Sequence, residues 1–332
     1  MGEPAIDVTA LAAALGRGDR RALARAITLV ESTREDHRLA AERLLAAVLP
    51  KSSDKSIRLG ISGAPGVGKS TFIESFGLLV IERGHRLAVL AIDPSSKRGG
   101  GSLLGDKTRM AELARRTECF IRPTPAGATL GGVARRTREA ILLCEAAGFD
   151  CVIVETVGVG QSETAVADMV DMFLLLLSPG GGDDLQGLKK GIVELADLIL
   201  VNKADGDLKA AASRAVADYR HALRLLRPPA PGWTAEVHGV SALTREGLAE
   251  VWALVEKHRA VMAKSGELKR RRAEQARAAL WREIGEGLLD AFRASRSIAA
   301  KLGEIEAEVA AGKESSLAAA RRLLDLFLKR KS

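Results

Sequence analysis

The sequence predicts an α/β fold in which helices cover both faces of an open, doubly wound, mainly parallel sheet. Short apolar runs after residue 56 end in Gly, Pro, Asp or Ser, which is typical of strands buried on both faces of such a sheet. The runs are IRLGIS, RLAVLAID, CVIVETVG, MFLLLLSP and DLILVNKAD, with AEVHGVSAL as the last. Helical patterns over 70–83, 134–147 and 213–226 separate them, giving the alternation of this fold class. Ligands bind such sheets at the carboxyl ends of the strands, so the residues directly after the runs are candidates for a site.

Three parts of the chain differ in pattern. Residues 1–55 place Leu, Ala and Ile at helical spacing, which predicts an N-terminal helical extension that ends near Pro50. Residues 56–260 carry the strand–helix alternation. Residues 261–332 form a charged helical tail in which large apolar residues recur on one face, and we expect this arm to be buried in a homodimer. The apolar residues are Leu280, Trp281, Ile284, Leu288, Leu289 and Phe292.

Composition excludes several classes of protein. The chain has 332 residues, 47% hydrophobic and 28% charged, which excludes wholesale disorder, a collagen-like repeat and a membrane bundle. Aromatic residues are only 3%, which argues against a nucleic-acid binder built on stacked rings. The net charge of +8 lies in the tail from Lys257 to Ser332, where basic residues alternate with Glu and Leu. A solvated arm explains that pattern better than a nucleic-acid surface, so we expect no nucleic-acid partner.

Cysteine usage and hydropathy indicate the compartment. Cys119, Cys144 and Cys151 show no CxxC spacing, and their odd number indicates reduced thiols rather than a metal site. The first residues, MGEPAIDVTA, lack the pattern of a signal peptide, and the longest apolar run, Met172 to Leu177, is too short to span a bilayer. We therefore expect a soluble cytoplasmic protein without a membrane partner.

The first apolar run leads directly into a phosphate-loop motif. Residues 63–70 read GAPGVGKS, which matches G-x-x-x-x-G-K-[ST] between a predicted strand and a predicted helix. In such loops glycines let backbone N–H groups surround the phosphates, the lysine reaches the β- and γ-phosphates, and the serine hydroxyl binds Mg²⁺. Lys69 and Ser70 take these roles here; an idle Gly-rich turn is the alternative.

A second motif predicts guanine specificity. Asn202 to Asp205 read NKAD at the end of the run DLILV. A carboxylate at Asp205 can accept hydrogen bonds from N1–H and the 2-amino group of guanine, which adenine cannot provide. Asn202 would support the loop, the Lys203 stem would cover the base, and Ser241–Leu243 (SAL) would contact guanine O6. Alone, NKAD is also an ordinary helix start, but its place downstream of a phosphate loop favours the guanine site.

Carboxylates after other runs predict a magnesium site. Glu155 begins ETVGVG after the run CVIV, where P-loop enzymes place a metal-linked carboxylate and a glycine, here Gly158, that senses the γ-phosphate. Asp93 closes another run and Asp106 lies in a Gly-rich loop. Helix capping and turn formation are the alternatives for Asp93 and Asp106. The loop from Ser178 to Lys190 leaves the same edge, and we expect it either to report the nucleotide state or to be a flexible connection.

The predicted site residues fall into three groups. The catalytic residues are Lys69, Asp93, Asp106, Glu155 and Gly158. The residues that bind the nucleotide are Gly63, Ala64, Pro65, Gly66, Val67, Gly68, Lys69, Ser70, Thr71, Asn202, Lys203, Asp205, Ser241, Ala242 and Leu243. The magnesium ligands are Ser70, Asp93, Asp106 and Glu155.

Taken together, the strings GAPGVGKST, AIDPSS, GGSLLGDKTRM, LGGVARRT, ETVGVGQSE, SPGGGDDLQG, DLILVNKAD and SAL resemble those of the MeaB/ArgK-like G proteins, which are GTPase chaperones of adenosylcobalamin-dependent methylmalonyl-CoA mutase. The resemblance implies a SIMIBI-class G domain, a helical N-terminal extension and a C-terminal arm that forms a homodimer. It also implies Mg²⁺-dependent hydrolysis of GTP to GDP and phosphate, which gates cofactor delivery and protects or reactivates the mutase. Asp183, Gln186 and Lys189 would lie in a third switch loop that communicates with the mutase.

Two other functions are compatible with a P-loop G domain. A nickel-inserting GTPase metallochaperone would need clustered His or Cys, whereas the five His residues are scattered through the sequence. A kinase linked to amino-acid transport would need a second substrate pocket, for which the sequence shows no signature.

Overall fold

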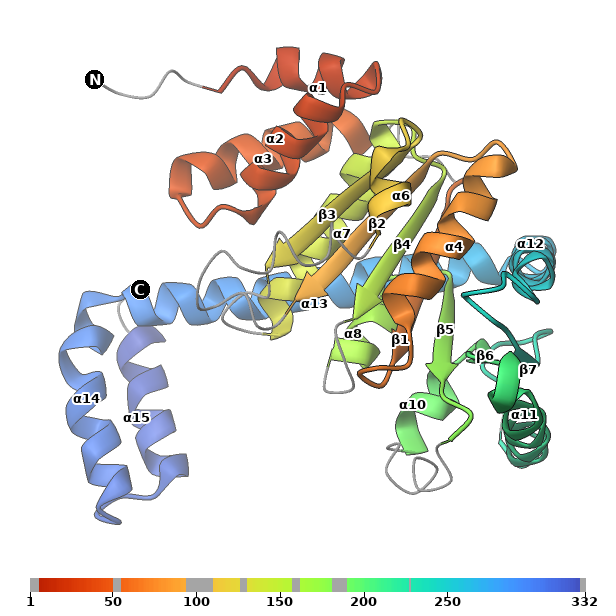
Figure 1. Ribbon diagram of the computed structural model, residues 1–332. Helices are drawn as coiled ribbons and strands as arrows, with labels where there is room; N and C mark the ends of the chain where they lie inside the picture. The colour runs from red at the N-terminus through yellow and green to blue at the C-terminus, as the bar shows by residue number, and fades with distance from the viewer. Residues whose placement is uncertain are drawn as a thin grey trace. The chain divides into compact units, whose positions relative to one another are not determined.

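The computed structural model describes residues 6–49, 55–93, 110–125, 130–156, 162–180, 190–226 and 228–328. They form two compact units, Met1–Gln275 and Ala276–Ser332, with the boundary inside one long helix (Figure 1). The expected three-part division at residues 55/56 and 260/261 stays a prediction.

The first unit is built on a seven-stranded sheet in which every neighbouring pair of strands is parallel. The strand order is β3-β2-β4-β1-β5-β6-β7. The strands are β1 (Ile57–Gly63), β2 (Leu87–Asp93), β3 (Cys119–Pro125), β4 (Cys151–Thr156), β5 (Met172–Leu177), β6 (Leu198–Val201) and β7 (Glu236–Gly239). The predicted doubly wound parallel sheet is confirmed.

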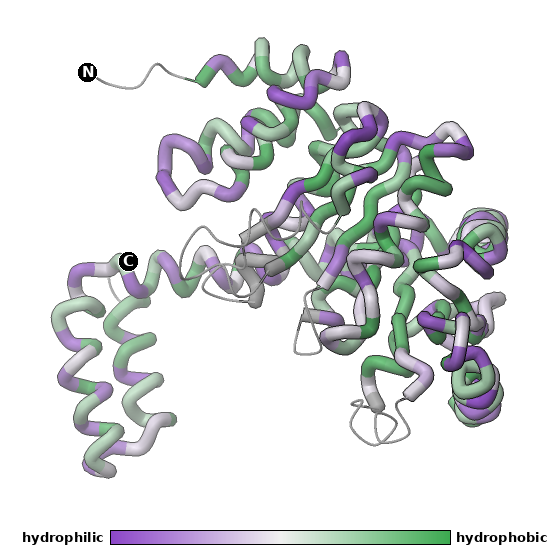
Figure 2. Tube along the Cα trace, viewed as in Figure 1, coloured by the Kyte–Doolittle hydropathy of each residue, from purple (hydrophilic) through white to green (hydrophobic). Residues whose placement is uncertain are grey.

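Successive residues of a strand point to opposite faces, and this alternation divides the core in two. On β5, Phe173 and Leu175 belong to one apolar cluster, and Leu174 and Leu176 belong to the other. One cluster includes residues of α7 (Leu130–Ala146), α8 (Ser162–Ala167), α10 (Lys190–Leu195) and α11 (Lys209–Leu223). The other includes residues of α4 (Lys69–Glu82), α6 (Ala111–Arg115) and α12 (Leu248–Lys264). Figure 2 shows the central strands mainly in the green of apolar residues, as burial on both faces requires.

The N-terminal helices α1 (Val8–Gly16), α2 (Arg20–Glu31) and α3 (Glu35–Val48) join the core of the first unit. Two of them start at aspartate caps, because Asp7 accepts the N–H of Ala10 and Asp19 accepts those of Arg21 and Ala22. All three helices contact α7, so this extension is packed on the sheet domain.

The three cysteines are free and buried. Burial raises the pKa of Cys119 to about 12 and raises the pKa of Cys144 and of Cys151 above the usual range of a thiol. All three therefore stay as unreactive thiols at neutral pH. Over the described ranges, no helix is both long and apolar enough to cross a membrane.

A network of buried charges lies at the amino ends of the strands. Arg272, in the first turns of α13 (Glu267–Ala294), contacts both carboxylate oxygens of Asp171, at 2.6 and 2.8 Å, and donates to the carbonyl of Ser56 at 2.9 Å. Arg271 donates to both carboxylate oxygens of Asp197, at 3.1 and 3.2 Å. The sequence alone suggested a solvated face for this basic run. The structure corrects that expectation at Arg271 and Arg272, which anchor α13 to the sheet.

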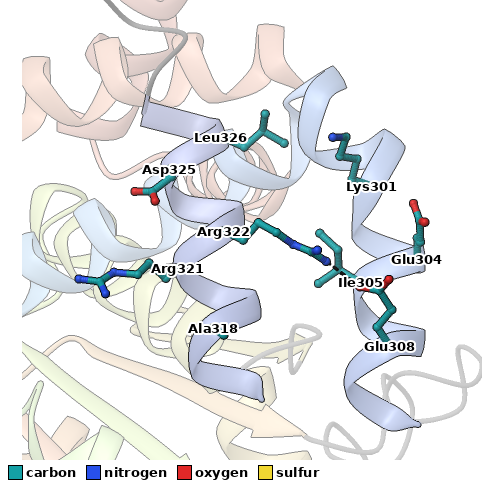
Figure 3. Close-up of a pocket in the computed structure, with 9 residues that line it drawn as sticks. All are labelled: Lys301, Glu304, Ile305, Glu308, Ala318, Arg321, Arg322, Asp325 and Leu326. Carbon is teal, nitrogen blue, oxygen red and sulfur yellow. Dashed lines mark hydrogen bonds and ion pairs between the residues drawn. The ribbon is translucent and has the colours of Figure 1, made fainter. Parts of the chain in front are cut away.

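The second unit contains the rest of α13 with α14 (Arg296–Ala310) and α15 (Ser316–Leu328). Ile298, Ile305, Ala319 and Leu323 form its small core. A groove of about 620 Å³ lies between α14 and α15 (Figure 3), and its lining is mostly charged. Within it Arg322 pairs with Glu308 at 2.7 Å, as the dashed line in Figure 3 marks.

The amino-edge network predicts an effect on stability. Asp171→Asn removes the charge that balances Arg272 in a mostly buried pair, so the free energy of unfolding should fall by about 3 kcal/mol. Urea unfolding followed by circular dichroism measures the change. Asp36→Asn is the matched control, since Asp36 forms an exposed pair with Arg34 and its loss should leave stability unchanged. Equal effects of the two substitutions would show that the network does not stabilise the unit.

Candidate nucleotide-binding site

The phosphate loop connects the end of β1 to the start of α4. Gly68 has φ +92°, and a Cβ at this position would lie 2.8 Å from the side-chain nitrogen of Asn202. Glycine is therefore required here both by the backbone conformation and by the close approach of Asn202. Val67 is buried in the core beneath the loop, which fixes the loop to the sheet. Pro65 and Gly66 are exposed at its tip, and Thr71 is exposed on α4.

The Lys69 ammonium lies inside this loop. Its Nζ donates to the carbonyl oxygens of Gly63 at 2.7 Å and Ala64 at 3.1 Å, and the residue is only 8% exposed. Burial lowers the pKa of Lys69, and the carboxylates of Glu155 and Glu163 oppose that shift. The loop thus presents a buried cation, held by its own carbonyls, at the carboxyl end of β1.

Ser70 and Glu155 come together at the same edge. Glu155 is buried on β4, paired with Ile61 of β1, and its Oε1 accepts the hydroxyl of Ser70 at 3.3 Å. A hydroxyl and a carboxylate are hard oxygen ligands, so this pair fits Mg²⁺. Among the described residues, no group of three or more His, Cys, Asp or Glu side chains could hold a metal ion.

The other predicted residues of the magnesium and switch shell are described only in part. Asp93 ends β2 beside β4, so its backbone lies at the same edge, but its side chain is outside the description. Asp106 and Gly158 fall outside the described residues, as do Asp183, Gln186 and Lys189. Their assigned roles stay predictions.

Asn202 joins the two motifs of the site. It follows β6, is 1% exposed, and its Nδ2 donates to the Val67 carbonyl at 2.9 Å. Its Oδ1 accepts the N–H of Ala242 at 3.1 Å. Through these bonds one side chain connects the phosphate loop, the NKAD segment and the SAL segment.

Lys203 and Asp205 complete this connection. Lys203 has φ +60°, and its Nζ donates to the Gly66 carbonyl at 2.8 Å, so its stem lies across the phosphate loop. Asp205 accepts the hydroxyl of the buried Ser241 at 2.7 Å, which fixes the carboxylate beside the SAL segment. Leu243 is exposed at the rim of the site.

Two residues of this site, Ser75 and Glu163, were not predicted from the sequence to have a role in it. Ser75 of α4 donates to the Ala242 carbonyl at 2.6 Å and so holds the SAL segment against the helix that follows the phosphate loop. Glu163, at the start of α8, is buried, and its negative charge opposes the lowering of the Lys69 pKa by burial. Ser75 lies a few positions beyond the phosphate loop, and Glu163 is the last residue of the string ETVGVGQSE, but neither the burial nor the partners of the two side chains can be deduced from spacing.

The position of Asn202 predicts a combined loss of binding and stability. Asn202→Ala leaves the Val67 carbonyl and the Ala242 N–H without their partner, so stability should fall by about 2 kcal/mol and nucleotide affinity by about tenfold or more. Urea unfolding and titration calorimetry measure the two effects. Ser213→Ala, which removes one exposed hydrogen bond on α11, is the control. Wild-type affinity in Asn202→Ala would show that the loop does not depend on this side chain.

Known proteins resemble this chain over nearly its whole length. A putative GTPase of Caulobacter vibrioides is 55% identical over 324 residues, covering 98% of this chain and 99% of that protein. The mouse protein described as methylmalonic aciduria type A homolog, mitochondrial, is 49% identical over 325 residues, covering 95% of this chain and 78% of its own length. A crystal structure described as LAO/AO transport system kinase has 37% identity and a TM-score of 0.77, and the match covers 99% of both chains.

A family model described as methylmalonyl Co-A mutase-associated GTPase MeaB matches residues 23–297. The match includes the phosphate loop, the NKAD segment and the SAL segment. With these motifs in one hydrogen-bonded site, and with relatives that are named GTPases, the chain belongs to the MeaB family of P-loop GTPases.

Proposed function

We propose that this protein is a Mg²⁺-dependent GTPase that acts as a chaperone of adenosylcobalamin-dependent methylmalonyl-CoA mutase. The GTPase activity is supported by one observation: hydrogen bonds through the phosphate loop and the SAL segment connect Lys69, Asn202 and Asp205. The mutase as partner is supported by the family description and by the name of the mouse relative.

Guanine specificity follows from the chemistry of Asp205. Its carboxylate, held by Ser241, can accept hydrogen bonds from N1–H and the 2-amino group of guanine. Adenine offers no such pair of donors, so ATP would leave a carboxylate unpaired at the base. The Lys203 stem would cover one face of the base from its place over Gly66.

Hydrolysis needs charge stabilisation more than covalent chemistry. In the proposed reaction water attacks the γ-phosphate, and GDP and phosphate leave. The N–H groups of the phosphate loop bind the phosphates, and the Lys69 ammonium stabilises the negative charge that develops on them. Ser70 and Glu155 would hold Mg²⁺, with Asp93 and Asp106 as further candidates. A bound ion would supply positive charge to the phosphates.

We propose that the loop between β5 and α10 communicates the nucleotide state to the mutase. Asp183, Gln186 and Lys189 would pair differently in the two nucleotide states, and hydrolysis would thereby gate delivery of the cofactor or reactivation of the mutase. The loop leaves the same edge of the sheet as the Glu155 segment, since β5 and β4 both flank β1.

A kinase remains the second candidate, because the solved structure with 37% identity is described as a transport system kinase. The two functions differ in the acceptor of the γ-phosphate. Release of inorganic phosphate without a labelled protein acceptor supports hydrolysis, whereas stoichiometric transfer to a protein supports the kinase.

We also propose a homodimer formed through α13. Its side chains Leu280, Trp281, Leu288 and Leu289 are more than half exposed, and Trp281 reaches 72%. Exposed apolar residues at helical spacing mark an interaction surface, and a second copy of the helix offers the same stripe in return. Location in the cytoplasm stays a prediction.

Asp205→Asn should change which nucleotide the protein hydrolyses, from GTP to xanthosine triphosphate. Asn presents a donor where Asp presents an acceptor. The rate of GTP hydrolysis at limiting nucleotide should therefore fall by about a hundredfold in the variant, and that of xanthosine triphosphate should rise by about a hundredfold. Hydrolysis is measured with each nucleotide, with and without the mutase. The mutase should stimulate hydrolysis of xanthosine triphosphate by the variant and hydrolysis of GTP by wild type. Equal use of GTP and ATP by wild type would contradict the guanine assignment, and no stimulation with any nucleotide would contradict the mutase assignment.

The dimer is tested in the full chain. Trp281→Glu combined with Leu288→Glu places two charges in the apolar stripe and should convert dimers to monomers in sedimentation velocity. Glu306→Ala, at an exposed position of α14, is the control and should stay dimeric. A dimer that persists with both glutamates would place the interface elsewhere.

A further inference from the structure

Ser75 connects the helix that follows the phosphate loop to the segment that we propose to contact the base. It lies in the second turn of α4, and its hydroxyl donates to the Ala242 carbonyl at 2.6 Å, although 167 residues separate the two in the sequence. Ala242 is only 4% exposed. A buried carbonyl that loses its donor is costly to the protein, so this hydrogen bond constrains the backbone of the SAL segment.

Packing holds α4 beside the chain that follows the SAL segment. Phe76 of α4 and Trp252 of α12 belong to the same buried apolar cluster, and their ring centroids lie 6.0 Å apart. Glu82, at the end of α4, pairs with Arg245 at 3.4 Å. The hydroxyl of Ser75 is therefore carried by a helix whose position the core fixes, and this helix starts at the phosphate loop.

Most other polar groups of the SAL segment already have partners inside the fold. Ser241 donates its hydroxyl to Asp205 at 2.7 Å, and the N–H of Ala242 goes to Asn202 at 3.1 Å. Leu243 is 82% exposed, and within the described ranges no group accepts a hydrogen bond from its N–H. This backbone donor is thus open to a ligand.

The hydrogen bond from Ser75 sets the direction of this donor. The carbonyl of Ala242 and the N–H of Leu243 belong to one peptide group, which is planar and trans. In a trans peptide the carbonyl and the N–H point in opposite directions. Because the Ser75 hydroxyl holds the carbonyl toward α4, the N–H of Leu243 points away from that helix.

Guanine carries one group that the Asp205 carboxylate cannot bind. The carboxylate is only an acceptor and suits N1–H and the 2-amino group, whereas the 6-oxo group beside N1 is itself an acceptor and needs a donor. Asp205 is joined to the SAL segment through the hydroxyl of Ser241. The N–H of Leu243, two residues further along the same segment, matches the need of the 6-oxo group.

We propose that Ser75 is a positioning residue for recognition of the 6-oxo group of guanine. By holding the Ala242 carbonyl it fixes the peptide group whose N–H, at Leu243, donates to that oxygen. A donor that is already ordered in the empty protein costs less to order when the nucleotide binds. This inference rests on the proposed GTPase function, and it adds a residue outside the NKAD and SAL segments that contributes to selection of the base.

Titration calorimetry on the full chain compares GDP with two analogues that each change one position of the base. The 6-thio analogue of GDP replaces the 6-oxygen by sulfur, a weaker acceptor, and inosine diphosphate lacks the 2-amino group. Wild type should bind the 6-thio analogue about tenfold more weakly than GDP. Ser75→Ala should lower the affinities for GDP and inosine diphosphate by about fivefold each, and that for the 6-thio analogue by less than about twofold. The preference for oxygen over sulfur should therefore shrink, while the preference for the 2-amino group stays as in wild type.

Two further variants serve as controls. Ser75→Thr keeps a hydroxyl at this position and should restore the wild-type preference for oxygen over sulfur. Ser213→Ala also removes a serine hydroxyl that bonds a carbonyl, that of Lys209 on α11, and it should leave all three affinities unchanged.

An equal loss of affinity for all three nucleotides in Ser75→Ala would overturn the proposal, because the hydroxyl would then only support the fold. Wild-type affinities in Ser75→Ala would also overturn it, as would a wild type that binds GDP and its 6-thio analogue equally well. If wild type binds no guanine nucleotide, the proposed GTPase function fails as well. Guanine binding by wild type together with an unshifted preference in Ser75→Ala removes only the role of Ser75.

Discussion

The parallel direction of all seven strands governs where chemistry can occur in this protein. Each strand returns to the same starting side through a helix, so the carboxyl ends collect at one edge of the sheet and the amino ends at the other. Residues 63–70, Glu155, Asn202 and Ser241 are far apart in sequence, yet all follow or end strands at the carboxyl edge. The amino edge carries the charges that anchor α13. One constraint thus separates the nucleotide site from the charge network that holds the first turns of α13.

The two edges use buried charge in different ways. At the amino edge Arg271 and Arg272 meet Asp197 and Asp171 with several short hydrogen bonds, so each charge is compensated within the fold. Such a network favours one arrangement over others. At the carboxyl edge the carbonyl oxygens of Gly63 and Ala64 accept hydrogen bonds from the buried Lys69 ammonium, and nearby carboxylates oppose the fall in its pKa that burial causes. Neutral carbonyls are thus the direct partners of this ammonium, whereas carboxylates are the direct partners of the guanidinium groups at the amino edge.

Hydrogen bonds between distant segments give the nucleotide site its shape. Gly68 and Asn202 approach so closely that a Cβ at position 68 would lie 2.8 Å from the Asn202 amide nitrogen, and Asn202 uses both its donor and its acceptor inside the site. Ser75 and Ser241 hold the SAL segment on the helix and on Asp205. The segments that we propose to bind the base and the phosphates are consequently joined through the same few buried polar groups.

The amino-acid sequence alone predicts the parallel fold, the phosphate loop, the NKAD and SAL segments and the family resemblance. It could do so because buried strands produce apolar runs, and because close approach of backbone to phosphate requires glycine at fixed spacing. Only the folded chain shows that Arg271 and Arg272 turn inward to Asp197 and Asp171, and that Glu163 is buried in the first turn of α8. The same holds for the link from Asn202 to both Val67 and Ala242. Those contacts join residues of different elements, and their energies depend on burial and on the charges nearby, which local sequence patterns do not contain.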